Sequence, residues 1–245
     1  MTGADLLVVF LAVGVGATVK GVTGIGLPLT AVPLMTLAIG AEDAVVSMAV
    51  PNLVSNVGIL VGTRSSRGEA RGLARFVVVG MAAAVGGAWI LTSVPERWLM
   101  WALAAIVLCF LVWRLRARDP YWNPAVRRRG WAPVAALAGV AQGSIGISGP
   151  IVAPWLQGHG YRRETFMFAT AFVFLMTGIA QVIGLSLAGV WNTDRVAGAA
   201  VAGAAVALWQ PLAFRYGRRL DQQGFERMVT AVLWVAAISL VVRAG

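Results

Sequence analysis

Two glycine- and proline-rich segments carry the residue types most suited to holding a small ion. The first runs from Lys20 to Met35 and the second from Gln142 to Leu156. Their key positions keep the same spacing: Gly21, Gly24 and Pro28 in the first, and Gly143, Gly146 and Pro150 in the second. Proline is tolerated in the first turn of a helix, where backbone N–H groups are unpaired anyway. We therefore expect each segment to interrupt a helix and to begin a second half-helix near its proline.

The backbone ahead of each proline has the chemistry of an anion site. Free N–H groups at a helix start, together with the positive end of the helix dipole, attract negative charge. The residues expected to form this site are backbone donors and neighbouring hydroxyls: Gly24, Gly26, Gly146, Gly149, Thr23, Ser144 and Ser148. The alternative is that these glycines only allow helices to pack closely.

Lys20 is the one basic residue inside a long apolar run. A charge within a membrane span is costly and marks a functional position by default, and a lysine there would neutralise an anion. The alternative is that its long side chain reaches a membrane surface. The corresponding position of the second segment is Gln142, which is polar but uncharged.

The helix expected after each segment also carries polar residues on one face. Asn52 and Asn56 are four residues apart, as are Thr177 and Gln181, so each pair shares a face of its helix. These four side chains are candidates to line a substrate cavity. They could equally act as hydrogen-bonding glue between helices.

Several kinds of chemistry have no residues to support them. The apolar runs hold no Asp, Glu or His, and the single cysteine, Cys109, excludes a disulfide within the chain and a thiolate metal cluster. Neither a phosphate-binding loop nor a nucleophile paired with a base is visible. We expect no enzyme activity, no cofactor and no metal site.

The composition is that of a membrane protein. Apolar residues make up 59% of the 245 residues and charged residues only 12%, and the mean hydropathy is +0.79. A soluble domain carries about 25% charged residues and could not bury this much apolar surface. The net charge of +10 does not indicate nucleic-acid binding, because the arginines cluster in short links between apolar runs.

The shared spacing of the two segments indicates an internal repeat. We expect an all-α membrane protein of two inverted repeats, each a broken, re-entrant helix pair followed by three transmembrane helices. Repeat 1 covers 1–113, with the broken pair at 4–39 and spans at 44–62, 74–94 and 97–113. A basic cytoplasmic linker covers 114–130. Repeat 2 covers 131–245, with the broken pair at 131–157 and spans at 164–190, 196–214 and 226–243. Both breaks are expected near the membrane midplane.

The distribution of arginines sets the orientation of this arrangement. If each broken pair enters and leaves on the same side, only Arg97, Arg195 and Arg243 fall on the face opposite the other arginines. If each pair crosses once, the arginines divide far more evenly. The positive-inside rule favours the first topology, with both termini outside the cytoplasm and the chain in the inner (plasma) membrane. The small-residue run 199–207 suits close helix packing, including packing within a homodimer.

The duplicated motif resembles that of TauE/SafE (sulfite exporter-type) permeases. The resemblance rests on GVTGIGLPLTAVP at Gly21–Pro33 and GSIGISGPIVAP at Gly143–Pro154, together with the link IGAEDAVVSMAV at Ile39–Val50. It implies transport of sulfite, organosulfonates or related anions, mainly outward, with Gly24, Gly26, Gly146 and Gly149 at the substrate. Leu27 and Ser148 stand where that family often has glycine, which leaves room for a different anion.

The resulting hypothesis is a secondary transporter that exports a small anion, bound between the two broken helices. Export needs no coupling ion, because an anion leaving a negative cytoplasm gains roughly 2.3 kcal/mol per charge per 100 mV. Two alternatives remain at this point: a cation or metal permease, and a non-transporting membrane assembly partner. The lack of carboxylate, histidine and cysteine ligands within the spans disfavours the metal permease.

Overall fold

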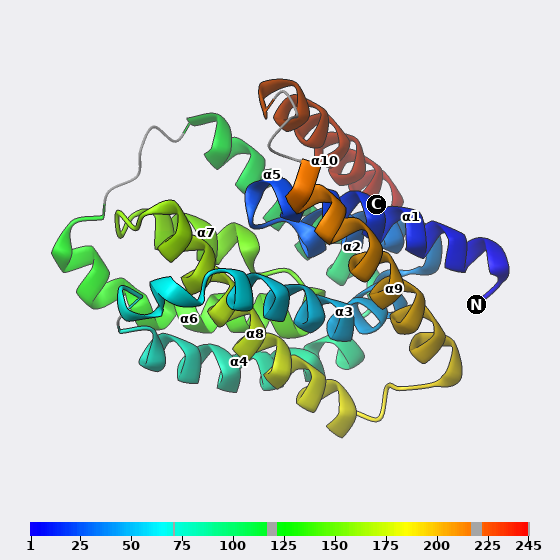
Figure 1. Cartoon of the computed structure of the whole chain (residues 1–245). Coiled ribbons are helices and arrows are strands. Elements are labelled where there is room, and N and C mark those ends of the chain that lie inside the picture. The colour runs from blue at the N-terminus through cyan, green and yellow to red at the C-terminus, as the bar shows by residue number, and fades with distance from the viewer. Residues whose placement is uncertain (71, 117–121, 217–221, 245) are drawn as a thin grey trace.

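The computed structural model describes residues 1–70, 72–116, 122–216 and 222–244, without the side chains of 22–23, 216 and 222–228. This part of the chain is helical and contains no strand (Figure 1). The helices are α1 (Gly3–Thr23), α2 (Leu27–Ile39), α3 (Ala41–Gly62), the short 3₁₀ helix η1 (Arg64–Gly68), α4 (Leu73–Ser93), α5 (Glu96–Arg116), α6 (Pro124–Ile145), α7 (Gly149–Gln157), α8 (Arg163–Leu187), α9 (Thr193–Tyr216) and α10 (Gln222–Ala244).

Six of these helices are long and apolar enough to cross a membrane. They are α1, α3, α4, α5, α8 and α9, while α2 and the apolar part of α10 are shorter. Apolar side chains such as Val78, Leu187 and Val235 are exposed on the outside of the bundle, where lipid covers them. The prediction of a multi-pass, all-helical membrane protein is confirmed.

The two expected broken helices are hairpins of unequal arms. In the first hairpin α2 folds back along α1 so closely that a Cβ on Gly16 would lie 2.6 Å from the carbonyl oxygen of Leu27. The long arms, α1 and α6, have 21 and 22 residues, or roughly 32 Å at 1.5 Å per residue. Each long arm therefore matches the hydrocarbon thickness of about 30 Å by itself.

The long arm of the second hairpin begins earlier than its apolar run suggests. Helix α6 starts at Pro124, inside the segment expected to be a basic linker, and the Asn123 side chain caps it by accepting from the N–H of Ala125 at 2.9 Å. Its first turns carry Arg127 and Arg128. Hydropathy does not predict this part of the helix, because charged residues at a membrane surface lower the mean hydropathy without ending the helix.

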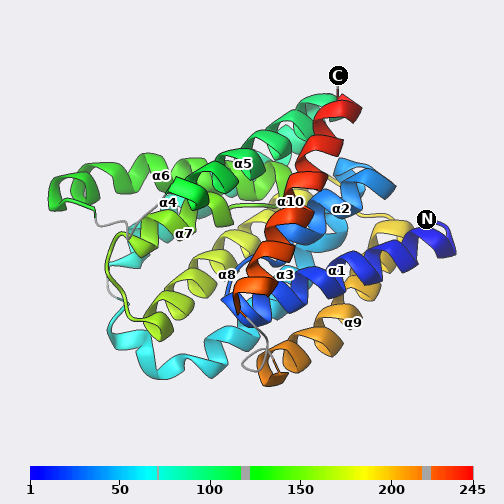
Figure 2. The ribbon, with the colours of Figure 1, turned by 90° about the horizontal axis from the view of Figure 1, so that it is seen from above.

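Helices from the two halves of the chain interleave. Helix α4 packs against α6 and α8, whereas α9 packs against α1 and α3 (Figure 1). Helices α3 and α8 cross at the centre, and α5 lies beside α10 (Figure 2). The contacts of α4 and α9 depend on small residues: a Cβ on Gly143 would lie 2.1 Å from the Ala84 carbonyl oxygen, and one on Gly21 would lie 2.4 Å from Ala213 Cβ.

The two ends of the bundle differ in charge. At one end Arg195 pairs with Glu42 at 3.0 Å and with Asp43 at 2.7 Å, and Arg243 donates to the carbonyl of Leu37. The terminal ammonium of Met1 contacts Asp194 at this same end, which we call the acidic end. The opposite end, where α5, α7 and α9 finish and α4, α6 and α8 begin, carries most of the arginines, and we call it the arginine-rich end.

Candidate functional site

The break between α1 and α2 depends on two glycines in left-handed backbone conformations. Gly24 ends α1 with φ 82°, and its N–H donates to the Lys20 carbonyl at 2.7 Å. Gly26 precedes α2 with φ 111°, and Pro28 follows in the first turn. A Cβ is strained at both angles. The first N–H groups of α2 have no intrahelical acceptors and point toward the arginine-rich end. Thr23 is the last residue of α1, and its side chain lies outside the described part.

The break between α6 and α7 uses one such glycine. Gly146 has φ 70° and donates to the Gln142 carbonyl at 3.1 Å. Ser148 precedes α7, and its carbonyl accepts from Val152 at 2.9 Å, while Gly149 and Pro150 form the first turn. The expectation that both segments interrupt helices, with proline in the first turn of each second half-helix, agrees with this geometry.

The two breaks lie at opposite depths, which differs from the expected position near the midplane. Gly24 packs against Met167, about one turn into α8 from its start, and Gly146 packs against Val45, about one turn into α3 from its start. Gly146 also lies near Gln181 of α8. Met167 and Gln181 are separated by roughly 21 Å along α8. The long arms α1 and α6 each cross nearly the whole bundle, so the breaks do not face one ligand together in this structure.

A buried polar cluster surrounds Lys20. The side chain of Lys20 is 0% exposed, and its Nζ donates to Asn56 Oδ1 at 2.6 Å. Asn56 in turn donates to the carbonyl and the side-chain oxygen of Asn52, at 2.8 and 3.2 Å. Among the described residues no carboxylate lies within salt-bridge distance of Lys20. The alternative that Lys20 reaches a membrane surface is therefore wrong, because its ammonium group is held inside the bundle.

A second buried cluster surrounds Gln142, the counterpart of Lys20. Gln142 Nε2 donates to Gln181 Oε1 at 2.8 Å, and Ser148 Oγ donates to Gln142 Oε1 at 2.7 Å. The Gln181 amide nitrogen is buried and has no hydrogen-bond acceptor in the described part. A buried donor without a partner costs about 1–3 kcal/mol. The nitrogen lies close to Gly146, where an anion or a water molecule would satisfy it.

Two of the expected site residues are used within their own helices instead. Thr177 Oγ1 donates to the Val173 carbonyl at 2.9 Å, and Ser144 Oγ donates to the Val140 carbonyl at 2.8 Å. The methyl group of Thr177 faces Gly80 of α4, at a helix contact. For these two residues the structure supports a packing role, because their hydroxyl protons are already donated.

A crevice of about 410 Å³ leads from the arginine-rich end to the first break. Its lining includes Gly26 and Thr30 on the α1–α2 side. On the other side are Arg114 of α5, Gln157 at the end of α7 and Arg163 at the start of α8. The Thr30 hydroxyl is buried and has no partner in the described part. Sequence reasoning missed Thr30, Arg114, Gln157 and Arg163 as site candidates. Of these four residues, only Thr30 has a sequence signal for a site, because it lies one turn after Gly26. In the sequence the two arginines serve only to indicate the orientation of the chain in the membrane.

The comparisons with known proteins identify a family for this chain. The model of the family described as sulfite exporter TauE/SafE matches residues 8–240, which is nearly the whole chain. No curated protein and no solved structure matches the chain. The matched region includes both helix breaks, both buried polar clusters and the residues that line the crevice. The chain therefore belongs to the sulfite exporter TauE/SafE family of membrane transporters.

Proposed function

We propose that this chain is a secondary transporter that exports a small anion such as sulfite or an organosulfonate. The observation that carries the proposal is the side chain of Lys20, which is fully buried and whose amino group has the neutral amide of Asn56 as its partner. A buried cation is expensive unless a negative charge accompanies it. No described carboxylate supplies that charge, so a substrate anion is the natural counter-ion.

The crevice gives the anion a route toward Lys20 from the arginine-rich end. Arg114 and Arg163 flank the crevice, and Gly26 closes its inner side at the positive end of α2. Val19, the neighbour of Lys20, also lines the crevice and packs against Gly26. A small displacement of the α1–α2 hairpin would therefore expose Lys20 to an anion in the crevice.

The second cluster provides a binding position for the anion further along the same path. Gln142, Ser148 and the unpaired amide of Gln181 lie beside Gly146 and the start of α7, toward the acidic end. These donors are neutral, so they would bind an anion more weakly than Lys20 and release it more easily. The proposed substrate contacts are thus divided by depth: Lys20, Thr23, Gly24, Gly26, Asn52 and Asn56 in the first cluster, and Gln142, Gly146, Ser148, Gly149 and Gln181 in the second.

The packing of the helices supports the inverted repeat as part of this proposal. If α1–α5 correspond in order to α6–α10, the contact of α4 with α6 corresponds to that of α9 with α1, and the contact of α4 with α8 to that of α9 with α3. The glycine contacts follow the same rule, because Gly24 meets Met167 and Gly146 meets Val45. Alternating access through such a pair of repeats is a common transporter design.

The direction of transport follows from the orientation. The positive-inside rule places the arginine-rich end in the cytoplasm. Both termini then lie outside the cytoplasm, and the crevice opens toward the cytoplasm. An anion that leaves along this route gains roughly 2.3 kcal/mol per charge per 100 mV of membrane potential. No group of three or more His, Cys, Asp or Glu side chains that could hold a metal ion occurs among the described residues.

Two substitutions that change the charge at or beside Lys20 test its role. The purified chain is reconstituted in liposomes loaded with radiolabelled sulfite, and efflux is driven by a potassium-diffusion potential that is negative inside. Asn56→Asp keeps the shape of the side chain but gives Lys20 an internal counter-ion, so efflux should fall at least about tenfold while the protein stays folded. Lys20→Met should also abolish efflux.

A matched substitution controls for the added charge. Asn123→Asp makes the same chemical change at the exposed cap of α6, where a carboxylate still caps the helix, so efflux should stay at the wild-type rate. Wild-type efflux in both Asn56→Asp and Lys20→Met, with thermal stability retained, would rule out Lys20 as the anion site.

A further inference from the structure

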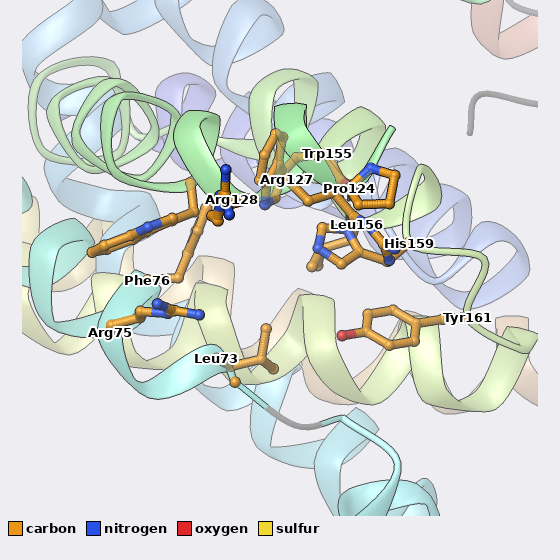
Figure 3. A pocket seen from close by; sticks show the side chains of 12 residues that line it. Leu73, Arg75, Phe76, Pro124, Arg127, Arg128, Trp155, Leu156, His159 and Tyr161 are labelled. Carbon is orange, nitrogen blue, oxygen red and sulfur yellow. Dashed lines mark hydrogen bonds between the residues drawn. The ribbon is translucent and has the colours of Figure 1, made fainter. Parts of the chain in front are cut away.

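A second cavity at the arginine-rich end lies on the other side of α7 from the crevice. It has a volume of about 310 Å³ and is bounded by the start of α4, the start of α6 and the end of α7 (Figure 3). Trp155 and Leu156 of α7 line this cavity, whereas Ala153 and Gln157 of the same helix line the crevice. The proposed transport path does not use this second cavity.

The charge of this cavity is positive. Arg75, Arg127 and Arg128 contribute to its lining, and none of its described lining residues is acidic. The Cζ atom of Arg75 lies over the ring of Trp131, 5.1 Å from its centroid, in a cation–π contact. Figure 3 shows the Arg75 guanidinium and the Tyr161 hydroxyl projecting into the space between α4 and α7. A guanidinium group can donate two parallel N–H···O bonds to two oxygens of a phosphate group.

An aromatic wall forms the opposite side of the cavity. Trp155 stacks on Trp122 with ring centroids 6.3 Å apart and meets His159 at 5.4 Å, and His159 stacks on Tyr161 at 5.6 Å. His159 Nδ1 donates to the Trp155 carbonyl at 2.9 Å, so Nε2 of the neutral ring is an acceptor, which suits a hydroxyl group on the organic part of a ligand. Burial lowers the pKa of His159, the hydrogen bond to the Trp155 carbonyl opposes this shift, and the positive charge of Arg127 adds to it.

We propose that this cavity binds a phosphate ester anion, with the arginines on the phosphate and the aromatic wall on the organic part. The volume suits a ligand the size of a headgroup. The cavity lies where helices end among tryptophans and arginines, which is the level of lipid headgroups in a membrane. The ester is therefore either the headgroup of an anionic phospholipid or a soluble phosphate ester, and an occupant of either kind contacts α7, which also borders the transport crevice.

Binding to the purified full chain in a non-ionic detergent tests the proposal. Native mass spectrometry measures saturable binding of phosphatidylglycerol against phosphatidylcholine, and thermal unfolding with added glycerol 3-phosphate measures the soluble ester. Arg75→Gln and Arg128→Gln should each weaken binding by about tenfold, the effect of one lost charge-assisted hydrogen bond. Arg129→Gln is the matched control, because Arg129 is exposed on the same helix but does not line the cavity.

The possible outcomes distinguish a lipid phosphate, a soluble phosphate ester and a cavity that binds no phosphate. Saturable binding of phosphatidylglycerol alone assigns the cavity to lipid, and binding of glycerol 3-phosphate assigns it to a soluble ester. If Arg129→Gln weakens binding as much as Arg128→Gln, or if neither probe saturates, the cavity is not a phosphate site. No flux is measured, so this result is independent of the transport function.

Discussion

Gly143 fixes how closely α6 approaches α4, and replacing it by alanine tests that contact directly. A Cβ at this position would lie 2.1 Å from the carbonyl oxygen of Ala84, 2.7 Å from the nitrogen of Ala88 and 2.8 Å from the carbonyl carbon of Gly87. An ordinary carbon–oxygen contact is about 3.3–3.6 Å. The two helices must therefore separate by more than about 1 Å. All three obstructing atoms belong to the backbone, so no side chain can rotate away.

The cost of Gly143→Ala follows from this geometry. Overpacking a close contact costs typically about 1–3 kcal/mol, and the rigid backbone places this substitution in the upper part of that range, about 2–3 kcal/mol. For a chain of this size that corresponds to a fall in Tm of roughly 4–12 °C. Thermal unfolding of the detergent-solubilised protein measures the change. Sulfite efflux should fall as well, because Gly143 lies one turn before Gly146 and next to Gln142, whose bond to Gln181 the displaced helix would strain.

The chain offers a matched control for this substitution. Gly86 is also a helical glycine, on α4, but a Cβ there would meet nothing within 4 Å. Gly86→Ala should therefore keep or slightly raise the Tm, since alanine is the better helix former. A Tm for Gly143→Ala within about 2 °C of the wild type would refute the inferred contact, because the helices would then have room that the structure denies.

The remaining predictions concern the second polar cluster and the acidic end. Ser148→Ala removes the donor that Gln142 Oε1 accepts at 2.7 Å, and leaving that buried oxygen unsatisfied should destabilise the protein by about 1–3 kcal/mol in thermal unfolding; an unchanged Tm would mean that water replaces the hydroxyl. Arg195→Gln breaks the ion pairs with Glu42 and Asp43 and should lower the Tm at low salt, with a smaller loss in about 1 M salt. Equal losses at both salt concentrations would contradict an electrostatic role.

The duplicated glycine motif shows how far the sequence could lead. The glycines of this motif turn out to have two structural uses, at different positions. Gly21 and Gly143 are at helix contacts that exclude a Cβ, whereas Gly24, Gly26 and Gly146 have positive φ angles at the breaks. The motif spacing located both breaks, but contact distances are needed to separate the two uses of glycine, because both require the absence of a Cβ.

The depth of the breaks could not be predicted from hydropathy. The apolar run of the second hairpin ends where arginines begin, although α6 continues through them to Pro124. A membrane surface accepts charged residues within a helix, so an apolar run gives the length of the buried part and not of the helix. For the same reason Arg114 and Arg163 looked like orientation signals, and only the packing of α5, α7 and α8 places them at the crevice.

A helical membrane protein with two matched helix breaks is predictable from composition, motif spacing and the positions of glycine and proline, because all of these are local properties. The sequence also singles out Lys20 as an unusual charge. Only the packed helices show that Lys20 is buried against Asn56, that Gln142 meets Gln181 and Ser148, and that Thr177 and Ser144 bond within their own helices. These outcomes depend on which helices cross and at what depth, and such contacts between distant segments follow from packing, which no local pattern encodes.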